Sequence, residues 1–212
     1  MAEENRPTDS QRGPDRRAAE EVRRHRLLFR VGREQVEAAI SLLEPLSRRC
    51  KKIIRITGTP YHDGSGDPLL ALDYALGVAH TTQVLDLELP GGILNVAHHP
   101  MGGSVLYQGT SVDREALWST ISGATGRTLE PRWIVRAHQH HWIMQATEHK
   151  TVVKLPCWQL QTPYAAKASY WRFQPSLGGV LMAKDDLEPG GWRFLPTLYE
   201  LPLGGPLQPG AL

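Results

Sequence analysis

Residues 133–142 of this 212-residue chain read WIVRAHQHHW, an apolar run that passes directly into a cluster of histidines. The aromatic and β-branched residues at its start predict a strand over 133–136. An extended chain advances about 3.3 Å per residue and alternates its side chains between two faces, so we expect His138 and His140 to project together and His141 to point away. Two imidazoles side by side suit a site that holds two metal ions about 3.5–4 Å apart.

Other expected strand ends also carry histidine, and eight of the nine histidines fall within residues 62–149. His98 and His99 directly follow an expected strand over 93–97, and His62 lies in a Gly-rich loop after one over 53–57. Side chains at strand ends are well placed to converge on a ligand, so three such ends predict a shared site. The alternative is a set of surface or hydrogen-bonded core histidines, the interpretation we favour for His25, His80 and His149 taken singly.

The chain on either side of this cluster predicts an α/β fold. Apolar spacing and N-terminal capping signals indicate helices that end near Ser47, span 67–79, and span 113–122 after a capped start at Ser111. The last of these has Ala116, Leu117 and Ile121 on one side. Strands are expected over 83–89 and 93–97, joined by a turn at Pro90-Gly91-Gly92, and then over 133–136, 142–147, 151–155, 169–173, 179–182 and 192–199. Helices alternating with strands first and strands alone later predict an α/β sandwich with mixed β-sheets.

Composition sets the broad class of the protein. We expect a polar, disordered arm over residues 1–30, one domain over 31–200 and a flexible Gly- and Pro-rich tail over 201–212. The net charge of +2 argues against a protein held on nucleic acid by bulk electrostatics alone, although a basic arm keeps DNA binding open as a third possibility. Two cysteines are too few for a disulfide framework, and the sequence has neither a secretory signal nor a membrane-spanning run. A cytoplasmic protein is therefore expected.

Three motifs carry a family resemblance, and they occur in the family's order. Gly58-Thr59-Pro60-Tyr61-His62-Asp63, then Val96-Ala97-His98-His99-Pro100, then Ala137-His138-Gln139-His140 resemble the later motifs of the calcineurin-like metallophosphoesterase superfamily, most closely the versions carried by bacteriophages and prophages. The similarity extends over about residues 36–182. It implies a metallophosphoesterase-like α/β sandwich that hydrolyses a phosphomonoester or phosphodiester with divalent metal ions, which an imidazole-rich site leaves open as Mn, Zn, Fe or Ni.

The resemblance also implies a role for each matching residue. His138 corresponds to a ligand of one metal ion and His140 to a ligand of the other. His98 corresponds to the family's lone histidine ligand, with His99 as the alternative. His62 matches the histidine that protonates the leaving oxygen or stabilises charge at phosphorus, and Asp63 orients it.

The sequence departs from the family pattern at two places. The loop at Gly58 has no asparagine to match the family's metal ligand, for which Thr59 is a weak substitute, and neither an Asp-x-His nor a Gly-Asp-x-x-Asp motif precedes that loop. We therefore expect an N-terminally incomplete site that needs acidic ligands from a partner chain. The substrate is then a phosphoester, with a nucleic-acid phosphodiester as one option and no membrane as partner. The alternative is a non-catalytic phosphoesterase-like subunit with a structural or replication-associated role.

Overall fold

The computed structural model describes residues 34–58, 67–99, 107–159 and 175–200. The chain divides into two compact units, one formed by residues 1–55 and 60–80 and the other by residues 56–59 and 81–212. The expected arm, tail and 169–173 strand lie outside the described residues. Within the described ranges, no helix combines the length and apolar character needed to cross a membrane.

The first unit contains a helix over residues 34–47 and α3 (Asp67–Leu76). The Arg55 guanidinium donates two hydrogen bonds to the Asp73 carboxylate of α3, at 2.6 and 2.8 Å. Helix α3 ends three residues before the predicted Ala79, because Gly77 takes a left-handed conformation (φ 66°) that stops it. Two strands of three residues each, β1 (Ile54–Ile56) and β2 (His80–Thr82), form a pair. The second strand was not predicted, because three residues are too few to show an alternating pattern.

The second unit is built on a five-stranded sheet in the order β3-β4-β5-β7-β6. The outer pairs β3–β4 and β6–β7 are antiparallel, and the inner pairs β4–β5 and β5–β7 are parallel. The predicted α/β class with a mixed sheet is therefore confirmed. The predicted hairpin turn is also present, since Leu89 pairs with Gly92 across it and Gly91 has φ 96°. The strands are β3 (Val84–Leu89), β4 (Gly92–Ala97), β5 (Trp133–Arg136), β6 (Ile143–Ala146) and β7 (Thr151–Lys154).

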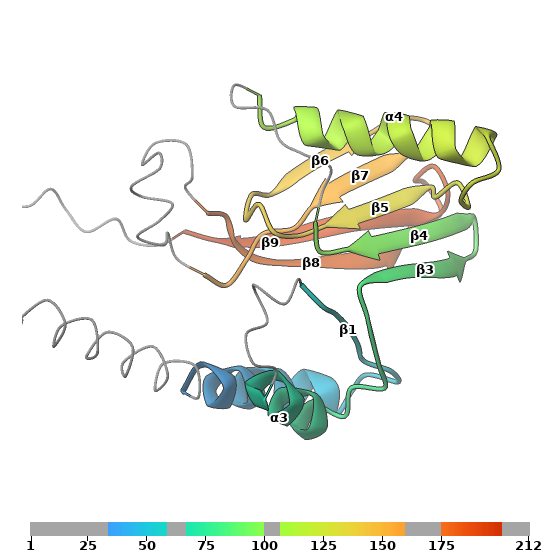
Figure 1. Cartoon of the computed structure of the whole chain (residues 1–212). Coiled ribbons are helices and arrows are strands. Elements are labelled where there is room, and N and C mark those ends of the chain that lie inside the picture. The colour runs from blue at the N-terminus through green and yellow to red at the C-terminus, as the bar shows by residue number, and fades with distance from the viewer. Residues whose placement is uncertain (1–33, 59–66, 100–106, 160–174, 201–212) are drawn as a thin grey trace, which may run out of the picture. The chain divides into compact units, whose positions relative to one another are not determined.

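Both faces of this sheet are covered, which makes a sandwich of three layers (Figure 1). Alternate residues of β5 point to opposite faces. Trp133 and Val135 pack with Phe194 of a hairpin formed by β8 (Leu177–Lys184) and β9 (Trp192–Tyr199). On the other face, Ile134 packs with Val112 of α4 (Thr110–Ala124). The sheet is thus the middle layer, between one helix and one hairpin.

Helix α4 differs from the sequence prediction in its start and in its buried face. It begins at Thr110, and its N-cap Gly109 makes no side-chain capping bond. The predicted apolar side is largely outside, since Leu117 and Ile121 are 57% and 40% exposed. The residues that are buried instead are Ser111, Val112 and Glu115.

The reason is the charge that the sheet presents to the helix. Arg136 of β5, Lys154 of β7 and Lys150, which directly precedes β7, contact α4, and each has a polar partner there. A buried cation is stable only when its donors are bonded, so α4 turns its polar residues inward. Alternation along β7 puts Lys150, Val152 and Lys154 on this one face.

Candidate metal centre

The site lies where the three parallel strands end. Strands β4, β5 and β7 run in the same direction, so their carboxyl ends share one edge of the sheet. His98 follows β4 directly, and the loop 137–141 follows β5. A hydrogen bond from the Ala137 amide to the His98 carbonyl (3.0 Å) holds the two segments together. Two histidine-bearing strand ends that are 40 residues apart in sequence therefore meet in space.

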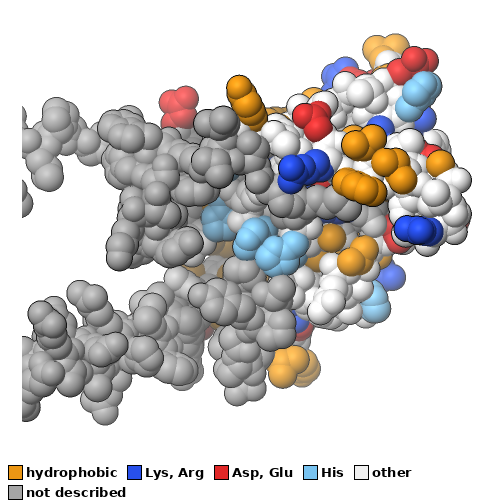
Figure 2. All heavy atoms as spheres, turned by 45° about the horizontal axis from the view of Figure 1, so that its top comes forward, with side chains coloured by type: hydrophobic (Ala, Val, Ile, Leu, Met, Phe, Trp, Pro, Cys, Tyr) orange, Lys and Arg blue, Asp and Glu red, His pale blue; other side chains and the backbone are white. Residues whose placement is uncertain are grey.

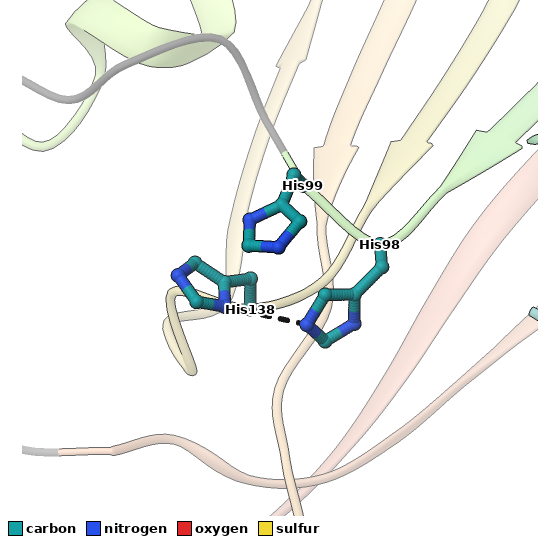
Figure 3. A group of neighbouring side chains, drawn as sticks. All are labelled: His98, His99 and His138. Carbon is teal, nitrogen blue, oxygen red and sulfur yellow. Dashed lines mark hydrogen bonds between the residues drawn. The ribbon is translucent and has the colours of Figure 1, made fainter. Parts of the chain in front are cut away.

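Three imidazoles face one another at this edge (Figure 3). Nitrogen atoms of His98, His99 and His138, one from each ring, all lie within 4.8 Å of one another. The His98 Nε2 and His138 Nδ1 atoms are 3.3 Å apart, and the ring centroids of His99 and His138 are 4.1 Å apart. His98 and His138 are half-buried and His99 is exposed, so the group is open to solvent on one side. Histidine side chains also gather on the surface in Figure 2.

The geometry fits a divalent metal ion. Zinc bound by imidazole has metal–nitrogen distances of about 2.0–2.1 Å, and tetrahedral angles then separate two ligand nitrogens by about 3.3 Å. The distance between His98 Nε2 and His138 Nδ1 already has this value. A His99 nitrogen within 4.8 Å of both atoms is the candidate third ligand. Three histidines with an open fourth position are one of the ligand sets of catalytic zinc sites.

The loop that carries His138 is not extended, so the extended backbone assumed for His138 and His140 is wrong. Strand β5 ends at Arg136, and His138 and His140 both have left-handed backbone conformations, with φ 64° and 57°. The Gln139 amide donates to the Ala137 carbonyl at 2.7 Å, which closes a tight turn between the two. Beyond this turn, the His140 carbonyl accepts a hydrogen bond from the Ser176 amide (2.8 Å).

The other predicted site residues are placed as follows. His140 is half-buried in the same loop but is not a member of the three-histidine group. His62 and Asp63, the predicted catalytic pair, lie outside the described residues, as does Thr59. His99, which the sequence left as the alternative to His98, lies beside it in the group.

The burial of the charged residues Arg136, Glu115 and Lys154 beneath the loop was not predicted from the sequence. The Arg136 guanidinium pairs with the Glu115 carboxylate at 2.8 Å, with side chains only 11% and 6% exposed. Beside it, Lys154 is 2% exposed, and burial lowers the pKa of its ammonium group below the usual range. Among the described residues beneath the loop, two cations therefore face one anion. The one available signal was a lysine closing the otherwise apolar run Thr151-Val152-Val153-Lys154.

Comparisons with known proteins give similarities to solved structures only. No protein-family model and no curated protein matches the chain. An archaeal phosphodiesterase is similar over 74% of each chain, with 12% identity and a TM-score of 0.39. Vps29 of Entamoeba histolytica in complex with zinc is similar over 74% of this chain and 88% of its own, with 13% identity and a TM-score of 0.41. A double mutant of the same Vps29 gives 14% identity and a TM-score of 0.43, over 76% and 89%. The identities are low and the TM-scores lie below 0.5, so no function is carried over from these proteins.

Proposed function

We propose that this protein is a metal-dependent phosphoesterase of the calcineurin-like type, which binds a divalent ion through His98, His138 and His99. The observation that supports the proposal is the three-histidine group at the ends of β4 and β5. Its three members come from two motifs that resemble those of the superfamily, and these motifs occur in the family's order along the chain. The expected substrate is a phosphomonoester or phosphodiester.

Two kinds of residue contribute to the proposed function: histidines that bind the metal ion and cations that attract an anionic substrate. His98, His99 and His138 supply neutral nitrogen ligands, a set that accepts Zn, Mn, Fe or Ni. Arg136 and Lys154, opposed only by Glu115 among the charges described beneath the loop, leave excess positive charge there. Positive charge in a buried position favours an anionic ligand such as a phosphoester. When bound, a divalent ion supplies Lewis acidity to a phosphoryl oxygen.

The remaining roles belong to residues outside the three-histidine group. We assign His140 to a second ion, in keeping with its place in the loop beyond His138. His62 is assigned to protonation of the leaving oxygen, with Asp63 holding its imidazole in the productive orientation. Carboxylates that complete a two-ion site come from beyond the residues grouped here, and a partner chain is one source.

Hydrolysis of bis(p-nitrophenyl) phosphate with Mn²⁺ tests this function. We expect activity that depends on metal, and loss of at least about 100-fold in the variants His138→Ala and His62→Ala, since each removes a group that acts in the transition state. The control is His149→Ala, because His149 is 83% exposed and is not in the three-histidine group. Equal activity in His138→Ala and His149→Ala contradicts the proposal.

A second candidate function is a phosphoesterase-like subunit without catalytic activity. The observation in its favour is that, among the described residues, no carboxylate belongs to the metal-binding group. An imidazole-only site holds one ion well, whereas two ions need acidic ligands that offset their charge. Metal binding in the absence of phosphodiester hydrolysis, both alone and with added candidate partner chains, supports this second function over the first.

A further inference from the structure

Lys154 is buried at the carboxyl end of β7, directly beneath the histidine loop. It is 2% exposed, yet the three acceptors of its ammonium group among the described residues are neutral oxygens. The Nζ atom donates to the Gln139 Oε1 atom at 2.7 Å, to the Gln108 carbonyl at 2.7 Å and to the Ser111 hydroxyl at 3.0 Å. An ammonium group has three N–H donors, so the site satisfies every one of them.

Gln139 is the residue through which this lysine reaches the histidines. It lies between His138 and His140, the two residues with left-handed conformations. Its side-chain oxygen accepts hydrogen bonds from Lys154 and also from the Ser111 hydroxyl of α4, the latter at 3.1 Å. Left-handed conformations of residues other than glycine persist only where the surrounding structure holds them. The hydrogen bonds from Lys154 and Ser111 hold Gln139, which lies between two such residues.

We propose that Lys154 is a positioning residue of the metal centre: it fixes Gln139, and thereby the turn that aims His138 at His98. The inference rests on the proposed metal binding by these histidines. Residues that hydrogen-bond to the surroundings of metal ligands commonly set the orientation of a ligand before the ion binds. Lys154 would have this effect on His138 through Gln139. Lys154 itself does not touch the ion or the substrate.

A second buried lysine on the same strand face provides a matched control. Lys150 is 8% exposed and also points from the sheet to α4. Its Nζ atom donates to the Ser119 and Thr120 hydroxyls at 2.7 and 2.8 Å and to the Glu130 carboxylate at 3.2 Å. None of these partners belongs to the histidine loop, so a general loss of packing affects Lys150→Met and Lys154→Met alike, whereas a loss of positioning affects only the second.

Titration of the full chain with Co²⁺, followed by its d–d absorption, separates the two effects. We expect Lys154→Met to raise the Kd for Co²⁺ by about 10–100-fold and to alter the absorption bands, as changes next to metal ligands do, and Lys150→Met to stay within about threefold of wild type. Gln139→Leu keeps the lysine and removes the link, so it is expected to behave like Lys154→Met and serves in its place if that variant does not fold. A Kd unchanged in Lys154→Met and Gln139→Leu, or raised equally in Lys150→Met, overturns the inference.

Amide hydrogen exchange of the metal-free protein keeps this result distinct from a failure of the proposed function. In Lys154→Met we expect the Gln139 amide, which is bonded to the Ala137 carbonyl, to lose protection by about tenfold or more, with no such loss in Lys150→Met. If wild type binds no Co²⁺, the proposed metal binding fails and the exchange data alone decide the positioning role. Unchanged protection in Lys154→Met overturns that role.

Discussion

Lys154 ends β7 and Lys150 directly precedes it, and both lysines are buried against α4. Lys150 donates hydrogen bonds to two hydroxyls of α4 and to the Glu130 carboxylate, so it stabilises the packing of the helix on the sheet. Among the described residues, Lys154 donates to neutral oxygens, one of which belongs to Gln139 between two histidines. The difference arises from position: Lys154 is at the shared carboxyl edge of β4, β5 and β7, where side chains from three strands meet, and Lys150 precedes the strand. The same residue type can therefore support stability at one end of a strand and a site at the other.

The largest loss of stability is expected when the buried ion pair between Arg136 and Glu115, beneath the histidine loop, is broken. Glu115→Ala leaves the 11%-exposed Arg136 guanidinium without its carboxylate, next to Lys154 across the β5–β7 pairing. Removing one partner of a buried pair costs about 3–5 kcal/mol of the free energy of unfolding, which urea denaturation measures. The matched control is Glu44→Ala, because it breaks an exposed pair with Arg48 and costs about 0.5 kcal/mol or less. A loss below about 1 kcal/mol in Glu115→Ala contradicts this assignment of the buried charges.

A smaller loss of stability is expected when Lys150, which directly precedes β7, is replaced. Lys150→Met removes three hydrogen bonds to the ammonium group and costs about 1–3 kcal/mol, because some of the freed partners can turn to solvent. Urea denaturation gives this value, and a phosphodiester assay on the same sample is expected to match wild type. Reduced hydrolysis by a fully folded Lys150→Met protein would contradict the distinction between Lys154 as a residue that supports the site and Lys150 as one that only stabilises the fold.

A glycine in the histidine loop is expected to stabilise the protein. His138 has φ 64°, a conformation that glycine adopts without steric cost, so His138→Gly should raise the free energy of unfolding by about 1 kcal/mol. The same change removes a metal ligand. Higher stability together with lost Co²⁺ binding would show that the loop conformation serves the site, whereas lower stability would show that the His138 imidazole supports the metal-free fold.

Lowering the pH is expected to weaken the ion pair between Lys150 and Glu130 slightly. The hydrogen bond from Lys150 lowers the pKa of the Glu130 carboxyl below its ordinary value of 4.5. A lowered pKa stabilises the folded state above the unfolded-state pKa, and that contribution disappears as the pH falls through the folded-state pKa. Glu130 is about half-exposed, so the effect is below about 1 kcal/mol. The stability difference between wild type and Glu130→Gln should shrink as the pH falls from about 6 to about 3, and a difference that grows with acid contradicts it.

Most of the sheet was predictable from sequence, because its strands are short apolar runs with clear turns. The hairpin at Pro90-Gly91-Gly92 and the strand over 133–136 are where the pattern indicated. The buried face of helix α4 was predicted incorrectly, since it includes Ser111 and Glu115 beside Val112 and leaves Leu117 and Ile121 exposed. Such pairing depends on which strands become neighbours, and a single sequence does not specify this.

The site was predictable in part, for a related reason. His98 and His138 were expected near each other as histidines at strand ends, and the structure brings them to 3.3 Å. The turn that separates His138 from His140 was not predicted, because it depends on Gln139 meeting Lys154 from a third strand. The predicted catalytic roles of His62 and Asp63 stay predictions.

Calorimetric titration with Zn²⁺ tests the central claim, that the strand-end histidines form a metal centre. Wild type and the exposed-histidine variant His149→Ala are expected to bind one ion with the same Kd, and the double variant His98→Ala with His138→Ala to bind at least about 100-fold more weakly, since two of three ligands are gone. Zn²⁺ binding of equal strength by the double variant and wild type would contradict the claim.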